Sequence, residues 1–195
     1  MLAAGQRHLA AVATLDVGKQ DLQQCADAAM RLHAEWLWQE GRADEASYPS
    51  GGGAIPWRRF RTGVEPRPSE RGFSWVPRGR PRDDHANYRR YLDAVFMWAN
   101  TVSLAHATPS PERPHPGDFF VLPGAPGHTV VVLDVAEAAD GRRVALIGQS
   151  FMPAQSFHVL RPSQTRSWFV LQQDGSVMTP FWRRFPGSSL RRLDG

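Results

Sequence analysis

One cysteine and one histidine are the side chains of this sequence best suited to covalent chemistry. Cys25 is the single cysteine of the chain, and His128 follows a tight turn of glycine and proline, GAPG, at the start of an apolar stretch. A thiol becomes a nucleophile when it is held as a thiolate, and a helix N-terminus with a nearby imidazole favours that form. The pair therefore predicts a thiol that attacks a carbonyl carbon, with His128 as the base that shuttles the proton to the leaving amine.

The imidazole of such a pair needs a third polar group to fix its ring, and Gln149 is the candidate. If the strand that begins at His128 pairs antiparallel with the strand that ends at Gln149, through a tight turn near Asp140, the two side chains share a face of the sheet. They then lie some rungs apart, so contact requires a longer loop or a bulge. Asp134, which is expected on the same face at the far end of the strand of His128, is the alternative.

The groups that would hold the substrate are expected around the cysteine. The backbone N–H of Cys25 and the side chain of Gln23 or Gln24 are candidate donors to the oxyanion. Arg31 is a candidate substrate ligand. Because Glu35 follows it by one helical turn, a structural ion pair between the two is the alternative for Arg31.

Two helices are expected to position these groups. The first begins at Asp21, which can cap it with Gln24 in a capping box, and its apolar stripe is formed by Leu22, Cys25, Ala26, Ala29, Leu32 and Trp36. The second spans residues 87–106, where an apolar stripe recurs at helical spacing. Cys25 is thus expected near the start of a helix, on its buried side.

Short apolar runs predict a sheet that these helices cover. Strands are expected within 6–17 and at 119–122, 128–135, 144–149, 156–160 and 168–171, with a tail that closes on the sheet through Phe181, Trp182, Phe185 and Leu190. The segment 48–86 is rich in proline, glycine and arginine, and its aromatic residues predict an ordered flap with strands at 55–62 and 73–76. We expect an α+β fold in one domain, 1–195.

Composition narrows the classes of function. The net charge of +4 rests almost wholly on arginines that are spread along the chain, which argues against nucleic-acid binding. A single cysteine excludes an internal disulfide and a cysteine-cluster zinc site, the histidines lack metal-ligand spacing, and no cofactor motif is present. No apolar run is long enough to cross a membrane, and the first residues do not form a signal peptide.

The order of these motifs resembles a known class of enzymes. A cysteine on an early helix, then Gly117-Asp118 with an apolar strand, then Gly127-His128 with another, is similar to the papain-like cell-wall hydrolases of the NlpC type and the CHAP amidases. That resemblance implies a papain-like fold, a cysteine and histidine pair, and a third polar residue on the next strand. The sequence departs from the NlpC pattern at Asp27, because those enzymes usually carry an aspartate just before the cysteine.

A closer resemblance covers most of the chain. The segments 16–38, 91–104, 116–136 and 147–160 resemble the bacterial domain-of-unknown-function family 4846. That family implies no reaction, but its members are often envelope proteins, so the resemblance favours the cell envelope, whereas a start at Met1 without a leader favours the cytoplasm.

Two hypotheses of function follow. The first is a cysteine hydrolase that cleaves an amide or peptide bond, with cell-wall peptide as one substrate and Cys25, His128 and Gln149 as its catalytic residues. The second is a catalytically silent binding or structural domain that uses its aromatic flap. Neither hypothesis involves a metal, and the oligomeric state is left open.

Overall fold

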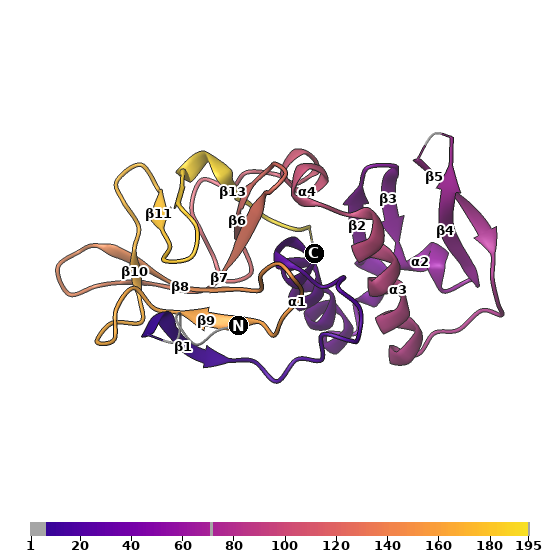
Figure 1. Cartoon of the computed structure of the whole chain (residues 1–195), viewed down its shortest axis with the longest axis horizontal. Helices are drawn as coiled ribbons and strands as arrows, with labels where there is room; N and C mark the ends of the chain where they lie inside the picture. The colour runs from indigo at the N-terminus through magenta and orange to yellow at the C-terminus, as the bar shows by residue number, and fades with distance from the viewer. Residues whose placement is uncertain (1–6, 71, 195) are drawn as a thin grey trace.

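The structure is a computed structural model that describes residues 7–70 and 72–194, and its largest sheet carries His128 (Figure 1). The strands of this sheet pair in the order β1-β9-β8-β7-β6-β13, all antiparallel, and β10 adds to β8. The chain therefore has the α+β architecture with an antiparallel sheet that the sequence predicts. The strands are Leu9–Val12 (β1), Phe119–Leu122 (β6), His128–Glu137 (β7), Arg143–Gln149 (β8), His158–Leu160 (β9), Phe169–Val170 (β10) and Leu190–Arg191 (β13).

Four helices and three small two-stranded sheets complete the described part of the chain. In Figure 1 the first helix lies between the large sheet on one side and the helix α3 with strands β2 to β5 on the other. The helices are Cys25–Gln39 (α1), Trp57–Phe60 (α2), His85–Trp98 (α3) and Thr101–Ala107 (α4), with short 3-10 turns at Ala43–Glu45 and Gly187–Ser189. The small sheets pair Ser47–Ser50 (β2) with Gly53–Pro56 (β3), Val64–Ser69 (β4) with Gly72–Pro77 (β5), and Val177–Met178 (β11) with Arg184–Phe185 (β12).

Helix α1 begins at Cys25, later than the expected start at Asp21. Gln24 is therefore the N-cap residue in place of Asp21. Its backbone is extended, and it donates its N–H to the carboxylate of Asp27 at 3.0 Å. The carboxylate of Asp21 instead accepts the backbone N–H of Ala154 at 2.6 Å. As a result the cysteine is the first residue of the helix.

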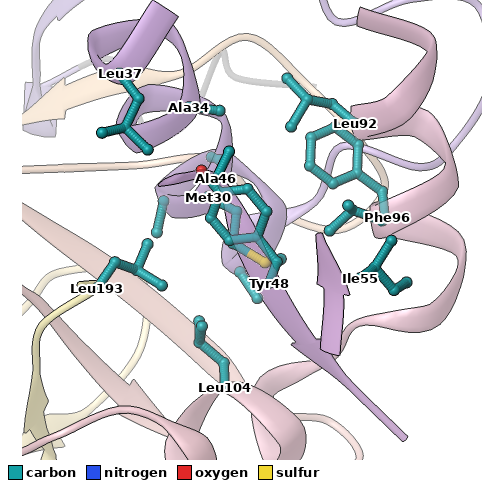
Figure 2. Close-up of a cluster of buried hydrophobic side chains, with 14 of the residues drawn as sticks. Met30, Ala34, Leu37, Ala46, Tyr48, Ile55, Leu92, Phe96, Leu104 and Leu193 are labelled. Carbon is teal, nitrogen blue, oxygen red and sulfur yellow. The ribbon is translucent and has the colours of Figure 1, made fainter. Parts of the chain in front are cut away.

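The two faces of the sheet pack against different partners. Side chains alternate between faces along a strand, so Val131 packs with α1 whereas Val130 and Val132 pack on the opposite face, against the C-terminal tail. The tail closes on the sheet as expected, through the buried Phe185 and Leu190. Figure 2 shows part of the cluster on the helical side, with side chains from α1 (Met30, Ala34, Leu37), from β2 and β3 (Tyr48, Ile55) and from α3 (Leu92, Phe96).

The flap is folded around aromatic side chains, as its composition predicts, but two local predictions for this half of the molecule were wrong. The expected strand 55–62 contains the short helix α2, because the side chains of Trp57 and Phe60 are both buried. The expected helix 87–106 is two helices. Asn100 divides it, because its side chain accepts the backbone N–H groups of Val102 and Ser103 and so caps a new helix.

A bulge in β7 sets the register of the strands that matter most. Val131 pairs with Gly148, but Asp134 pairs with Leu146, so β7 carries one extra residue between the two pairs. The alternation of faces shifts here, because Val132 and Val135 both pack on the side of the C-terminal tail; Asp134 between them is exposed and accepts the backbone N–H of Val135. Asp134 therefore does not share the face of His128, and the alternative that assigned it to the imidazole was wrong.

Candidate functional site

The thiol of Cys25 lies at the start of α1 and is almost completely buried. The residue is 3 % exposed, and burial raises the pKa of the thiol above its ordinary value. The backbone N–H of Thr129 and the N–H groups at the start of the helix act in the opposite direction, and the nearby carboxylate of Asp27 raises the pKa further. In the resting protein the thiol is therefore protonated at neutral pH.

The backbone register locates the thiol relative to the strands. Val132 exchanges hydrogen bonds with Gly117 and Asp118 on the β6 side, so alternation turns the N–H of Thr129 toward β8. The last pair between β7 and β8 at this end is Val131 with Gly148. The thiol thus lies where the two strands stop pairing, a place we call the β7–β8 junction.

His128 and Gln149 meet at the same junction. Gln149 pairs with His158 on β9 and reaches His128 across the strands, with 2.8 Å between the ring Nε2 and the amide Oε1. The bulge at Leu133 makes this contact possible, because it moves Gln149 nearer to His128 than an unbroken hairpin would. The two side chains thus meet through a bulge, which is one of the two conditions that the sequence analysis set for their contact.

The hydrogen bonds around Gln149 define one tautomer of His128. An amide oxygen only accepts, so the Nε2 of His128 carries its proton. The amide nitrogen of Gln149 lies 3.3 Å from the Nε2 of His158, whose Nδ1 lies 3.1 Å from the carbonyl oxygen of Ser156. If each of these groups donates in turn, all three bonds are satisfied. The Nδ1 of His128 is then the unprotonated nitrogen, which is the form a base requires.

The ring of His128 is enclosed by aromatic side chains. Its centroid lies 4.7 Å from that of Trp182 and 5.1 Å from that of Phe151, and the residue has no exposed surface. Burial lowers the pKa of His128 to about 4, against the opposing effect of the bond to Gln149. The imidazole is therefore neutral at pH 7. Within the described residues, neither ring nitrogen of His128 is hydrogen-bonded to the thiol of Cys25, because Nε2 contacts Gln149 and Nδ1 has no partner.

Several buried polar atoms of the described residues, near the start of α1 and the start of β7, lack a hydrogen-bond partner. Within residues 7–70 and 72–194, hydrogen-bond partners are lacking for the Nε2 of Gln23, the Oδ1 of Asp27, the Nδ1 of His128 and the Oγ1 of Thr129. We call these four the unpartnered atoms. Folded proteins pair nearly all of their buried polar groups, so each unpaired one requires an explanation, and a bound ligand or an ordered water is among the groups that could supply the partner.

Arg31 is held by the protein itself. Its guanidinium donates to Glu35 at 2.7 Å, to the side-chain oxygen of Gln23 at 3.1 Å and to the backbone oxygen of Asp16 at 3.2 Å. The ion pair with Glu35 is the alternative that the sequence left open. The bond to Gln23 orients that amide, whose nitrogen lacks a partner among the described residues.

A cavity of about 280 Å³ opens beside Cys25. Gln24 lines it and donates its side-chain N–H to Asp21 at 3.1 Å, so its amide is engaged at the rim. Asp27 also lines it and was not predicted as a site residue, because in the sequence it appeared only as a departure from a motif. Its place at the third position of α1, where a carboxylate faces back to the helix start, was the available signal.

The fold and the site define an α+β protein with a buried thiol and a buried imidazole at one junction of its sheet. The model of the family described as Domain of unknown function (4846) matches residues 2–192, and the chain belongs to this family, as its sequence predicts. A search of the curated proteins and a search of the solved structures each gave no match. The comparisons thus support the family and give no support to the resemblance to papain-like hydrolases.

Two further observations concern the described residues only. Among 7–70 and 72–194, no three histidine, cysteine, aspartate or glutamate side chains are grouped so that they could hold a metal ion. In the same part of the chain, every helix is too short or too polar to cross a membrane.

Proposed function

We propose that the protein is a cysteine hydrolase that cleaves an amide or peptide bond, with a papain-like arrangement of Cys25, His128 and Gln149. The observation that carries the proposal is the hydrogen bond from the Nε2 of His128 to the Gln149 amide. This bond leaves the basic Nδ1 without a partner among the described residues, next to Thr129, whose backbone N–H lowers the pKa of the Cys25 thiol. Cell-wall peptide is the substrate suggested by the sequence resemblance.

The reaction begins with transfer of the thiol proton from Cys25 to the Nδ1 of His128. The sulfur forms a bond to the carbonyl carbon of the substrate, and the oxyanion accepts hydrogen bonds from the backbone N–H of Cys25 and the side-chain nitrogen of Gln23. The protonated imidazole then donates to the leaving amine as the C–N bond breaks. Water, deprotonated by the same nitrogen, attacks the thioester and releases the acid and the free thiol.

The charges of the resting site decide how this chemistry starts. The pKa of the thiol is raised and that of His128 is lowered to about 4, so both groups are neutral before substrate enters. A preformed thiolate and imidazolium pair is thus disfavoured. The proton must move during the attack, and the histidine acts as a general base rather than as a permanent counterion.

The single cysteine makes a direct test possible. Iodoacetamide labels only Cys25, and its rate can be followed by mass spectrometry across pH. At pH 7 we expect His128→Ala to label about a hundredfold more slowly than the parent, because the general base is lost. His106→Ala, at an exposed histidine, is the matched control and should label at the parent rate. Equal, slow labelling of the parent and His128→Ala would exclude His128 as the base.

Gln149 and His158 are expected to act through His128 as positioning residues. In Gln149→Leu the ring loses its only hydrogen bond within the described chain, and in His158→Leu the amide loses the contact that sets its orientation. Nitrogen-15 spectra of the histidine rings should show a single tautomer of His128, protonated at Nε2, in the parent and a mixture in both variants. A merely structural role would leave the tautomer unchanged.

One observation favours the second candidate, a catalytically silent domain. The thiol is 3 % exposed, and burial raises its pKa, as for an inert core cysteine. The labelling experiment separates the two candidates, because a silent domain predicts that the rate does not depend on His128.

A further inference from the structure

The cavity beside Cys25 has an unbalanced charge. Its lining carries two carboxylates, Asp21 and Asp27, while lysine, arginine and histidine are absent from the described residues that line it. The other polar groups of the lining are neutral, on Gln24, Asn100 and Thr101. A ligand that enters this cavity thus meets negative charge without a neighbouring positive group of the protein.

Among the described residues of the lining, Asp27 is the carboxylate with one unpaired oxygen. The residue is 6 % exposed, and its Oδ2 accepts the N–H of Gln24 at 3.0 Å. Its Oδ1 is one of the four unpartnered atoms, with no hydrogen-bond partner in residues 7–70 and 72–194. A buried carboxylate oxygen without a partner is costly, so a donor that the ligand supplies would recover free energy there.

We propose that this cavity binds a substrate group that carries a protonated primary amine, and that Asp27 is the specificity-determining residue that pairs with it. The inference rests on the proposed function, because it assigns the amine to the part of the substrate that lies next to the thiol. A volume of about 280 Å³ is at the small end of ligand cavities, which suits a terminal amino group on a small residue better than a large side chain.

The electrostatics of the site support this assignment. Burial raises the pKa of Asp27 to about 7, so at neutral pH the carboxyl loses its proton readily when a cation arrives. The charge of Asp27 also raises the pKa of the Cys25 thiol. An ammonium group paired with Asp27 offsets that effect, so a substrate with the amine makes the thiol easier to deprotonate than one without it.

Binding can be tested in Cys25→Ser, which cannot form a thioester. The probes are L-alanine amide, which is cationic at neutral pH, and N-acetyl-L-alanine amide, which is neutral. The readout is the carbon-13 signal of the Asp27 carboxyl during titration with each probe. We expect the cationic probe to bind at least about tenfold more tightly than the neutral one, as for a desolvated charge pair.

Two variants complete the test. Asp27→Asn in the same background should remove the preference for the cationic probe, measured by backbone amide shifts at the cavity. Glu137→Gln, at an exposed acidic residue on β7 outside the cavity, should keep it. Equal affinity for the two probes, or no saturable binding of the cationic one, would overturn the inference.

The outcome is distinguishable from that of the labelling experiment. If the cationic probe binds through Asp27 but Cys25 labels independently of His128, the hydrolase proposal fails and the amine site stands. If labelling depends on His128 but the two probes bind alike, the amine site fails and the hydrolase proposal stands.

Discussion

The buried hydroxyls on one side of α1 and the buried polar groups at its N-terminus differ in how the fold treats them. On the α3 side, the hydroxyl of Tyr88 donates to the backbone oxygen of Ala34 at 3.1 Å, and that of Tyr91 donates to the backbone oxygen of Ile55 at 2.7 Å. Tyr48 bonds His33 at 3.0 Å. At the N-terminus, in contrast, Gln23, Asp27, His128 and Thr129 contribute the four unpartnered atoms.

This difference shows that the fold is able to satisfy buried polar groups where their role is structural. Ten buried side-chain atoms of the described residues lack a partner, and four of them belong to Gln23, Asp27, His128 and Thr129. The tyrosine region has two exceptions, since the indole N–H of Trp57 and the Nε2 of His33, the residue bonded to Tyr48, also lack a partner among the described residues. Unpaired atoms alone therefore do not distinguish the two regions. The N-terminus of α1 differs because it combines unpaired atoms with a thiol and a cavity.

The largest change in stability is expected in the aromatic cluster around Trp57. Trp57 has no exposed surface, and its ring lies 5.0 Å from that of Tyr88 and 5.5 Å from that of Tyr91. We expect Trp57→Ala to lower the free energy of unfolding by about 3–5 kcal/mol, measured by urea denaturation. Met97→Ala, at a residue that is 63 % exposed, should change it by about 0.5 kcal/mol or less. A similar small loss for both variants would contradict the packing described for Trp57.

The next largest change in stability is expected at Asp27, and it depends on pH. Because burial raises the pKa of Asp27 to about 7, the folded protein keeps a proton that the unfolded chain releases, and stability falls as pH rises from about 4 to 7. This contribution is absent from Asp27→Asn. Between pH 5 and pH 7 the variant should therefore gain about 2 kcal/mol relative to the parent, measured by urea denaturation at each pH.

The control for this prediction is Asp134→Asn, because Asp134 is exposed on β7. Its stability should follow that of the parent at every pH. Parallel curves for the parent and Asp27→Asn would show that Asp27 ionises normally in the folded protein.

A smaller effect is expected for a hydroxyl that has partners. Tyr91→Phe removes the hydroxyl that donates to the backbone oxygen of Ile55, whereas the backbone oxygen of Ala46, which lies 3.3 Å from the hydroxyl, still accepts the N–H of Trp57 at 2.8 Å. We expect the free energy of unfolding to fall by about 1–2 kcal/mol, measured by thermal and urea denaturation. An unchanged stability would mean that the hydroxyl is not needed by the carbonyl group of Ile55.

The smallest expected change is a gain in stability, at a buried hydroxyl near the start of α1 that has no partner in the described part of the chain. Thr129 is fully buried, and its hydroxyl lacks a partner within the described residues. Thr129→Val keeps the shape and removes the unpaired group, so we expect a gain in stability of up to about 1 kcal/mol in the same denaturation experiments. A loss as large as that of Tyr91→Phe would mean that Thr129 is structurally satisfied after all.

Much of the fold can be predicted from local patterns. The apolar strands around His128 and the shared face of His128 and Gln149 were predicted from the period of two and from the turn near Asp140, whereas their contact also depends on the bulge in β7. The two-helix break at Asn100 was also predictable, because asparagine is a strong N-cap residue. It was missed because the apolar stripe runs through it.

The features that escaped sequence analysis depend on distant contacts. The bulge at Leu133 lies in a run of apolar residues, VVVL, that carries no local signal for an extra residue. The role of His158 depends on pairing with Gln149, and the importance of Asp27 depends on a cavity formed with the turn 124–127. Whether Cys25 is reactive depends on burial, which a periodic pattern alone does not measure.

The bulge in β7 also divides the hairpin into two parts that can vary separately. The pairing of Val131 with Gly148 lies on one side of it, and the largely exposed tip, 137–143, lies on the other. An insertion at the tip adds residues to the hairpin without a change in the pairing of β7 with β8 at the junction. The tip is therefore a permissive position for a fused peptide or a fluorescent reporter, which would allow the protein to be tethered while its thiol and imidazole keep their places.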